Sequence, residues 1–375
     1  MSIDTHGVPP PGAFIREELE ARGWSQRDLA FVMDCPEQAV NMIISGKRGI
    51  SPDMANLLGD AFDVAPDFFA NLQKAYDMAH ARKAEPGVAR RGRIQAQYPL
   101  REMMKRGWLM ETSDPAMLEG QLMNFFRVSS TAEIPHMRHA AKKTNYEEVP
   151  APQLAWLFRV KQLAETQQVA RYSEKALRAS LDRLRAFLTE PEETRHVPRL
   201  LAECGVRFIL VEGLPQSKID GVCFWAKGTP VIGMSLRFDR IDNFWFVLRH
   251  EIEHVLREDG KDEDIIDAEL EGEKASTSAN IPAEERAANA AASEFVVPRA
   301  ELDKFIARVR PMYSDQRVTQ FARRIGIHPG LVVGQLQRHE EIPYANLRKH
   351  LVKVRQFLAP AALVDGWGHT PSLPV

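Results

Sequence analysis

The residues best suited to chemistry lie in segment 249–254, which reads Arg-His-Glu-Ile-Glu-His. Residues four apart share one face of a helix, so His250 and His254 can direct ring nitrogens at the same metal ion. Glu251 lies one step round the helix, where it can take a proton from a metal-activated water without binding the metal. The apolar run 244–248 predicts a buried helix, which argues against the alternative of a merely solvated polar face. The pattern therefore predicts a Zn2+ site with Glu251 as general base.

A catalytic zinc site needs a third protein ligand and an open position. No histidine follows His254 at the metzincin spacing, so a carboxylate from a later helix is the alternative. Segment 285–289 reads Glu-Arg-Ala-Ala-Asn on an Ala-rich stretch, and helical spacing places Glu285 and Asn289 on one face. We expect Glu285 to bind the metal. We expect Asn289 to orient a ligand histidine without contacting the metal itself. The other acidic candidates on this stretch are Glu284 and, less favoured, Glu294.

The segments before the histidine pair have the composition of strands. Runs 206–211, 222–226 and 230–234 are rich in β-branched and aromatic residues, and residues 227–229 predict a hairpin turn. Strand 230–234 is expected to offer an edge to which an extended peptide could be added. Asp242 is expected to cap the helix that carries the histidines.

Five short helices are predicted between residues 13 and 79, and three spacings suggest a helix-turn-helix. Small Ala30 lets two helices cross closely, Asp34 lies at the turn, and Val40 fills the core between the helices. The sequence places helix-start signals at Ser25 with Asp28, at Pro52 and at Pro66.

This arrangement leaves polar side chains free to contact DNA. Gln38 and Asn41 can bond an adenine edge in the major groove, and Glu37 can accept from cytosine. Gln26, Lys47 and Arg48 are expected to hold phosphates. The alternative is a small helical bundle that serves only for dimerisation or partner binding.

Composition narrows the class of protein. The 375 residues predict two or three domains, and 44% hydrophobic with 27% charged residues excludes a disordered or fibrous chain. A net charge of −2 excludes a wholly basic nucleic-acid coat. The sequence has no membrane-spanning run, no secretory pattern and three scattered cysteines, from which we expect a cytoplasmic protein.

We expect a multidomain chain. Its predicted parts are an all-α helix-turn-helix domain (10–80), a basic linker and helical connector (81–190), an α+β domain with the metal site (191–310) and a helical C-terminal region (311–375). Within the connector, the dipeptide at 86–87 has the composition of a linker. An acidic loop is expected at 258–273. The tail repeats a helix-turn-helix spacing at Ala322, Gly326 and Val332, to which we give little weight as a DNA contact.

Segments 12–20, 23–30 and 44–52 resemble the lambda-repressor-like (Xre) domain of HigA-type antitoxins, over residues 12–78. The resemblance implies a homodimer that reads a palindromic operator in double-stranded DNA, usually as a repressor. Asp34 replaces the usual glycine at the turn, which is tolerable because Asp adopts left-handed conformations.

Segments 215–221, 230–234, 244–254 and 285–298 resemble the ImmA/IrrE family of metallopeptidases, over about residues 195–300. The resemblance implies a gluzincin-like domain with zinc on His250, His254 and Glu285, and with Glu251 as general base. Glu253 stands where a small residue is usual, and Ala287 stands where a second glutamate often occurs.

Two functions remain open from the sequence. The first is a DNA-binding, antitoxin-like regulator whose zinc domain hydrolyses peptide bonds in a partner or in itself. The second is a non-catalytic HigA-like antitoxin or repressor whose zinc domain only binds a ligand or a toxin. Both share DNA binding, whereas a third, a housekeeping protease with an incidental helical N-terminus, would bind no operator.

Overall fold

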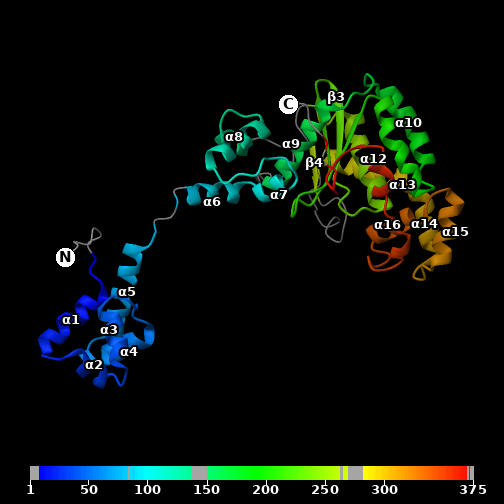
Figure 1. The fold of residues 1–375 in the computed structure, drawn as a ribbon. Helices are drawn as coiled ribbons and strands as arrows, with labels where there is room; N and C mark the ends of the chain where they lie inside the picture. Colours follow the sequence, from blue (N-terminus) through cyan, green and yellow to red (C-terminus); the bar gives the residue numbers. More distant parts are fainter. Residues whose placement is uncertain are drawn as a thin grey trace. The chain divides into compact units, whose positions relative to one another are not determined.

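The computed structural model describes residues 8–82, 85, 87–136, 150–261, 265–268, 282–369 and 371. The chain forms two compact units, Met1–Pro86 and Gly87–Val375, coloured from blue to red along the sequence in Figure 1. The boundary falls within the dipeptide at 86–87 that the sequence analysis treats as a linker. The expected subdivision of the second unit at residues 190 and 310 stays a prediction.

Five helices form the first unit, as predicted. They are α1 (Pro11–Arg22), α2 (Gln26–Val32), α3 (Glu37–Ile44), α4 (Pro52–Phe62) and α5 (Pro66–His80). Ser25 and Asp28 form the expected capping box, because each side chain accepts a hydrogen bond from the other residue's backbone N–H, at 3.2 and 2.7 Å. Leu29 and Leu58 lie in the core with no exposed surface, and Val40 is 1% exposed. Asp34 joins α2 to α3 in a left-handed conformation with φ 48°, as the turn requires.

Helices also open the second unit. They are α6 (Gly87–Gln97), α7 (Leu100–Lys105), α8 (Pro115–Phe126), α9 (Ala151–Thr166), α10 (Glu174–Ala186) and α11 (Val197–Glu203), with short 3-10 turns at Thr131–His136 and Pro191–His196. Two arginines of the predicted basic linker and connector (81–190) form contacts within this unit. Arg90 pairs with Glu119, and Arg106 donates to the carbonyl oxygens of Glu212 and Gly213.

A five-stranded mixed sheet follows. Its strands are β1 (Arg207–Val211), β2 (Ile219–Ala226), β3 (Thr229–Met234), β4 (Ile265–Ala268) and β5 (Leu363–Asp365), in the spatial order β4-β2-β3-β1-β5. The predicted hairpin is confirmed, since β2 and β3 pair antiparallel around the turn at 227–228. The prediction that strand 230–234 forms an edge is wrong, because β3 lies between β2 and β1. Strand β4 lies inside the segment expected to be an acidic loop, and most of the rest of that segment falls outside the described residues.

Alternating strand residues face two separate cores. Phe208 and Leu210 of β1 pack with α12 (Ile241–Arg257), whereas Ile209 and Val211 pack with α9 on the opposite face. The sheet is therefore sandwiched between α9 and α12, and Figure 1 shows these helices on its two sides. Trp156 of α9 and Trp245 of α12 are fully buried. Burial of each such large side chain stabilises the fold by roughly 1.5–3 kcal/mol.

The N-cap of the histidine-bearing helix lies two residues earlier than expected. Arg240 is the N-cap residue of α12, and Asp242 lies in its first turn, where it is 4% exposed and paired with Arg240. The prediction that Asp242 caps the helix is therefore wrong. The carboxylate of Asp242 pairs with the guanidinium of Arg240, and it does not cap the free backbone N–H groups at the start of the helix.

Five further helices follow α12 in the described part of the chain. They are α13 (Ala283–Val296), α14 (Arg299–Val309), α15 (Asp315–Ile325), α16 (Pro329–Arg338) and α17 (Arg355–Leu358), with a 3-10 turn at Arg348–His350. Two of them, α13 and α16, pack on α12. Helices α15 and α16 meet at Gly326 with φ 72°, which matches the helix-turn-helix spacing of the tail. Residues 330–337 of α16 are nevertheless all buried, and the helix packs on α12. A helix covered in this way cannot enter a major groove. None of the described helices combines the length and the apolar character needed to span a membrane.

Candidate metal centre and nucleic-acid interface

The long, buried helix α12 presents the motif residues on one side. His250, Glu251 and His254 each have no exposed surface, although all three are ionisable. Buried ionisable groups of this kind need compensating partners. Helix α13 packs directly against α12 and brings Glu285 to the histidines.

Three potential ligand atoms converge between these two helices. The Nε2 atoms of His250 and His254 lie 3.0 Å apart. Glu285 Oε2 lies 3.4 Å from Nε2 of His250, and Glu285 Oε1 lies 3.4 Å from Nε2 of His254. Within the described residues this is the one group of three such side chains whose ligand atoms all lie within 4.8 Å of one another.

This spacing fits a zinc ion. Tetrahedral bonds of about 2.0–2.2 Å place neighbouring ligand atoms about 3.3–3.6 Å apart, close to the three observed separations. Two imidazoles and one carboxylate are also a usual ligand set for catalytic zinc, which leaves a fourth position open. The side chain of Glu285 is 17% exposed, so the group is not sealed from solvent.

The carboxylate of Asp259 contacts the second ring nitrogen of His254, and no motif in the sequence predicts this contact. Asp259 Oδ2 lies 3.1 Å from His254 Nδ1 and also accepts from Arg257 Nε at 3.1 Å. Burial alone would raise the pKa of Asp259, but its hydrogen bonds with His254 and Arg257, together with the charge of Arg257, bring this pKa below its ordinary value. An ionised Asp259 holds the proton on Nδ1, which leaves the Nε2 lone pair of His254 for a metal.

Asp259 reaches His254 because α12 ends in a left-handed residue. Glu258 has φ 62°, and the chain turns back so that the backbone N–H of Asp259 donates to the carbonyl oxygen of His254. The only signal in the sequence is a carboxylate five residues after the second histidine. Asn289, which we expect to orient a histidine, has a buried Oδ1 without a hydrogen-bond partner among the described residues, so its role stays a prediction.

Gly221 of β2 leaves the space that Glu251 occupies. A Cβ atom at this position would lie 1.9 Å from Glu251 Oε1, so any larger residue would displace the carboxylate. The register of β2 against β4 shifts between Ile219 and Gly221, so the strand is irregular where it meets the helix. A sheet glycine that allows close approach of another group is a recurring feature of such sites.

The two departures from the family pattern are compatible with the site. Glu253 pairs with Arg249 one turn earlier at 2.8 Å, which neutralises a largely buried guanidinium. Ala287 leaves Glu285 as the acid that meets the histidines. Of the alternatives to Glu285, Glu294 accepts from the backbone N–H of Arg299 at 2.9 Å, at the start of α14.

The predicted DNA contacts all lie in the first unit, around α3. Glu37, Gln38 and Asn41 are exposed on α3, and Asn41 Nδ2 donates to Gln26 Oε1 at 3.2 Å. This bond joins the beginning of α2 to the exposed face of α3. Lys47 and Arg48 are also exposed, in the turn that follows α3.

Comparison with known proteins assigns the two units separately. Residues 15–69 match the helix-turn-helix family, and residues 205–335 match the IrrE N-terminal-like domain of peptidase family M78. The HTH-type transcriptional regulator YddM of Escherichia coli (strain K12) is 32% identical over 83 residues, which are 22% of this chain and 86% of the relative. Virulence-associated protein A' of Dichelobacter nodosus is 39% identical over 72 residues, which are 19% of this chain and 63% of the relative. The chain therefore belongs to the family of helix-turn-helix transcriptional regulators, and its second unit carries an M78 peptidase-like domain.

Proposed function

We propose that this regulator carries a zinc-dependent metallopeptidase, which hydrolyses peptide bonds in a partner protein or in the chain itself. The observation that carries the proposal is the convergence of His250, His254 and Glu285 next to the buried Glu251. Bound zinc would act as a Lewis acid that polarises a peptide carbonyl and makes a water molecule more acidic.

The chain's own residues supply the remaining chemistry. Glu251 takes the proton of the attacking water and passes it to the leaving amine. Asp259 keeps His254 in the tautomer that binds metal, and Gly221 gives Glu251 its position. Strand β4 pairs only with β2 among the described residues, so its outer side is where an extended substrate could be added as a further strand.

DNA binding is the second part of the proposal. Gln38 and Asn41 on the exposed face of α3 contact base edges, with Glu37 beside them, while Gln26, Lys47 and Arg48 contact phosphates. We infer a homodimer on a palindromic operator in double-stranded DNA, acting as an antitoxin-like repressor in the cytoplasm. The protein partner would be a toxin or a repressor that is cleaved.

The alternative is a non-catalytic repressor whose zinc domain only binds a ligand or a toxin. The variant Glu251→Gln separates the two functions, because it removes the base and leaves the three proposed ligands. Under the proposal the variant retains zinc and operator binding but loses cleavage and derepression, measured with the purified chain and an operator reporter. Glu174→Gln, at an exposed position of α10 in the same unit, is the matched control and should behave as wild type. If Glu251→Gln derepresses normally, the peptidase proposal fails and the alternative stands.

A separate experiment tests whether α3 is the helix that recognises the operator sequence. Gln38→Ala combined with Asn41→Ala should abolish preference for the operator over random DNA while leaving salt-dependent, nonspecific binding intact. The matched control is Asn56→Ala with Asn71→Ala, which removes two exposed amides of the same unit away from α3. An unchanged operator preference in a gel-shift titration would refute the assignment.

A further inference from the structure

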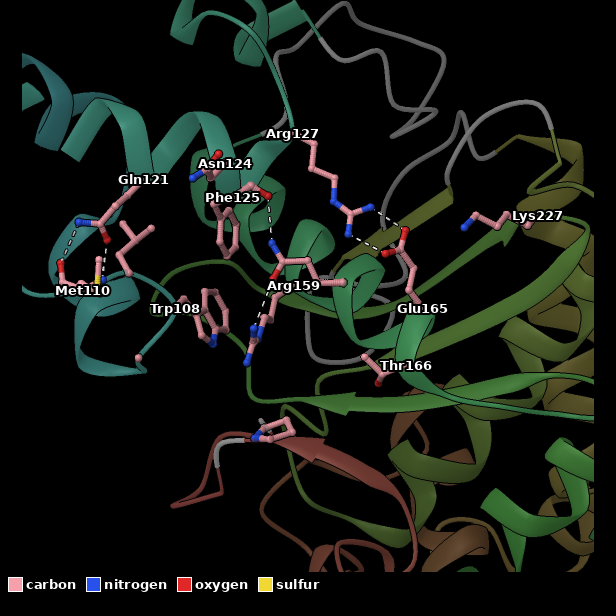
Figure 2. Close-up of a pocket in the computed structure, with 14 residues that line it drawn as sticks. Trp108, Met110, Gln121, Asn124, Phe125, Arg127, Arg159, Glu165, Thr166 and Lys227 are labelled. Atoms are coloured by element: carbon pink, nitrogen blue, oxygen red, sulfur yellow. Dashed lines mark hydrogen bonds and ion pairs between the residues drawn. The ribbon is translucent and has the colours of Figure 1, made fainter. Parts of the chain in front are cut away.

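The second unit contains a cavity that the metal centre does not use. It has a volume of about 810 Å3 and lies between the α7–α8 connection, helices α8 and α9, the turn between β2 and β3, and Pro371 after β5 (Figure 2). Neither Glu251 nor any of the three candidate metal ligands lines it. Its volume lies within the range of small-molecule sites.

One wall of the cavity is aromatic. Trp108 and Phe125 are 8% and 5% exposed, and their rings stack with centroids 6.0 Å apart and planes inclined by 18°. Trp108 Nε1 donates to Asp365 Oδ2 at 2.9 Å, which fixes the orientation of the indole. A rigid aromatic wall of this kind suits a flat apolar group.

A buried arginine lies next to this wall. Arg159 is 4% exposed, its Nε donates to Asp365, and its Nη1 donates to Gln162 Oε1 at 3.2 Å. The part of the chain that the structure describes provides no hydrogen-bond partner for Nη2 of Arg159. An arginine that lines a cavity with a free N–H edge is suited to bind a carboxylate or a similar acid.

The described residues that line the cavity carry a net positive charge. Arg127 and Glu165 neutralise each other through two hydrogen bonds of 2.6 Å, which Figure 2 shows as dashed lines. Lys227 is exposed at the other side of the cavity and forms no ion pair with the described residues. Because Asp365 balances Arg159, Lys227 leaves one positive charge in excess, which attracts an anion.

We propose that this cavity binds a small organic anion, whose flat apolar body packs on Trp108 and Phe125 and whose acidic group is held by Arg159. Lys227 attracts the acidic group into the cavity. The site goes beyond the proposed peptidase and operator functions, because it shares no residue with either. Since its walls join α7 and α8 to α9, a bound anion stabilises the packing of the helices that begin the second unit. This makes it a site for an effector.

The test uses 8-anilinonaphthalene-1-sulfonate, a fluorescent probe with a flat apolar body and one acidic group. The full-length chain should bind it saturably with a stoichiometry of one, as measured by fluorescence titration. N-phenyl-1-naphthylamine has the same skeleton without the sulfonate and should bind at least about fivefold more weakly. Equal affinity for both probes would overturn the claim that the site selects an anion.

Cavity-filling variants test whether the probe binds in this cavity. Asn124→Trp and Thr166→Phe fill the cavity from exposed positions on α8 and α9, and each should abolish binding of both probes. Ala116→Trp adds the same bulk to an exposed position of α8 outside the cavity and should bind as wild type. Circular dichroism verifies the fold of each variant. Undiminished binding in folded forms of the two filling variants would overturn the proposal.

Lys227→Asn tests the excess charge without straining the turn, because residue 227 has φ 52° and asparagine tolerates this conformation. The change should weaken binding of the sulfonate probe by about fivefold and leave the neutral probe unaffected. An equal loss for both probes, or no loss for either, would contradict a role for this charge.

Discussion

A zinc-binding imidazole depends on the group that holds its second nitrogen, and for His254 the structure places Asp259 there at 3.1 Å. The spacing of the two histidines in sequence says nothing of this contact, which needs the left-handed end of α12. Gly221 also positions a site residue, because the absence of a side chain at this position leaves room for the carboxylate of Glu251. Both residues act on the candidate site without being part of the histidine motif.

Asp259→Ala should therefore weaken zinc binding by about 10- to 100-fold, because His254 loses the acceptor that fixes its tautomer. Competition with a chromophoric chelator measures the affinity directly, without reference to hydrolysis. Glu258→Asn is the control, since this neighbour is exposed, pairs only with Lys261 among the described residues, and asparagine tolerates its left-handed conformation. An affinity equal to that of wild type would show that Asp259 does not position the ligand.

Gly221→Ala should retain zinc but lower the rate of hydrolysis by about 10²- to 10⁴-fold, the usual contribution of a positioned general base. The reason is the distance of 1.9 Å between the new Cβ and Glu251 Oε1, which forces the carboxylate to move. At Gly213 the nearest atom to a new Cβ is Ser217 Oγ at 3.4 Å, so Gly213→Ala is the matched control and should leave the rate unchanged. Full activity of Gly221→Ala would mean that Glu251 is not held where we place it.

Among the elements, α16 shows how tertiary packing overrides a sequence pattern. Its spacing with α15 is typical of a helix-turn-helix, but α16 is buried and cannot contact DNA.

The N-cap residue of α16 is His328. His328 Nδ1 accepts from the backbone N–H of Gly330 at 3.0 Å, so the cap requires a neutral ring. Burial, followed by the positive charge of His350, lowers the pKa of His328 from 6.5.

This cap predicts a pH dependence of stability. Because the pKa of His328 is lower in the folded than in the unfolded chain, the unfolded chain binds more protons as the pH falls below about 6.5, and folding loses free energy. His328→Asn keeps a capping side chain and removes the titration, so the variant should lose less stability than wild type between pH 7 and 5. Denaturant unfolding at both pH values measures the difference. An identical loss in the two proteins would contradict a neutral cap.

At the scale of the whole molecule, the two units have separate hydrophobic cores. The buried core residues described in the first unit lie between Ile15 and Phe69, and the candidate metal centre lies in the second unit. A ligand stabilises only the unit that binds it, by about 2.7 kcal/mol at a free concentration of about 100 times its Kd. Each unit should therefore respond to its own ligand.

Calorimetry should accordingly show two unfolding transitions. Removal of zinc with a chelator should lower the transition temperature of the second unit alone, and operator DNA should raise that of the first alone. The chain with Glu251→Gln should show the same zinc-dependent shift as wild type, since it retains the ligands. A single transition that moves with either ligand would show that the units unfold together.

Much of this protein follows from the sequence alone. The helix-turn-helix and the β2–β3 hairpin were predictable because neighbours along the chain determine caps, turns and periodicity. The spacing of His250 and His254 on one helix follows from the same local geometry. Such features depend on backbone conformation within a few residues, which the sequence encodes directly.

Only the tertiary structure decided the rest. The sequence left three acids as possible third ligands, and only the packing of α13 on α12 shows that Glu285 meets the histidines. The contact of Asp259 with His254 depends on how the chain turns back after α12, and the central place of β3 depends on the pairing of distant strands. The burial of α16 has the same origin. The physical reason is that packing is set by the shape and apolar surface of the whole unit, so a local pattern can predict an element without predicting what that element faces.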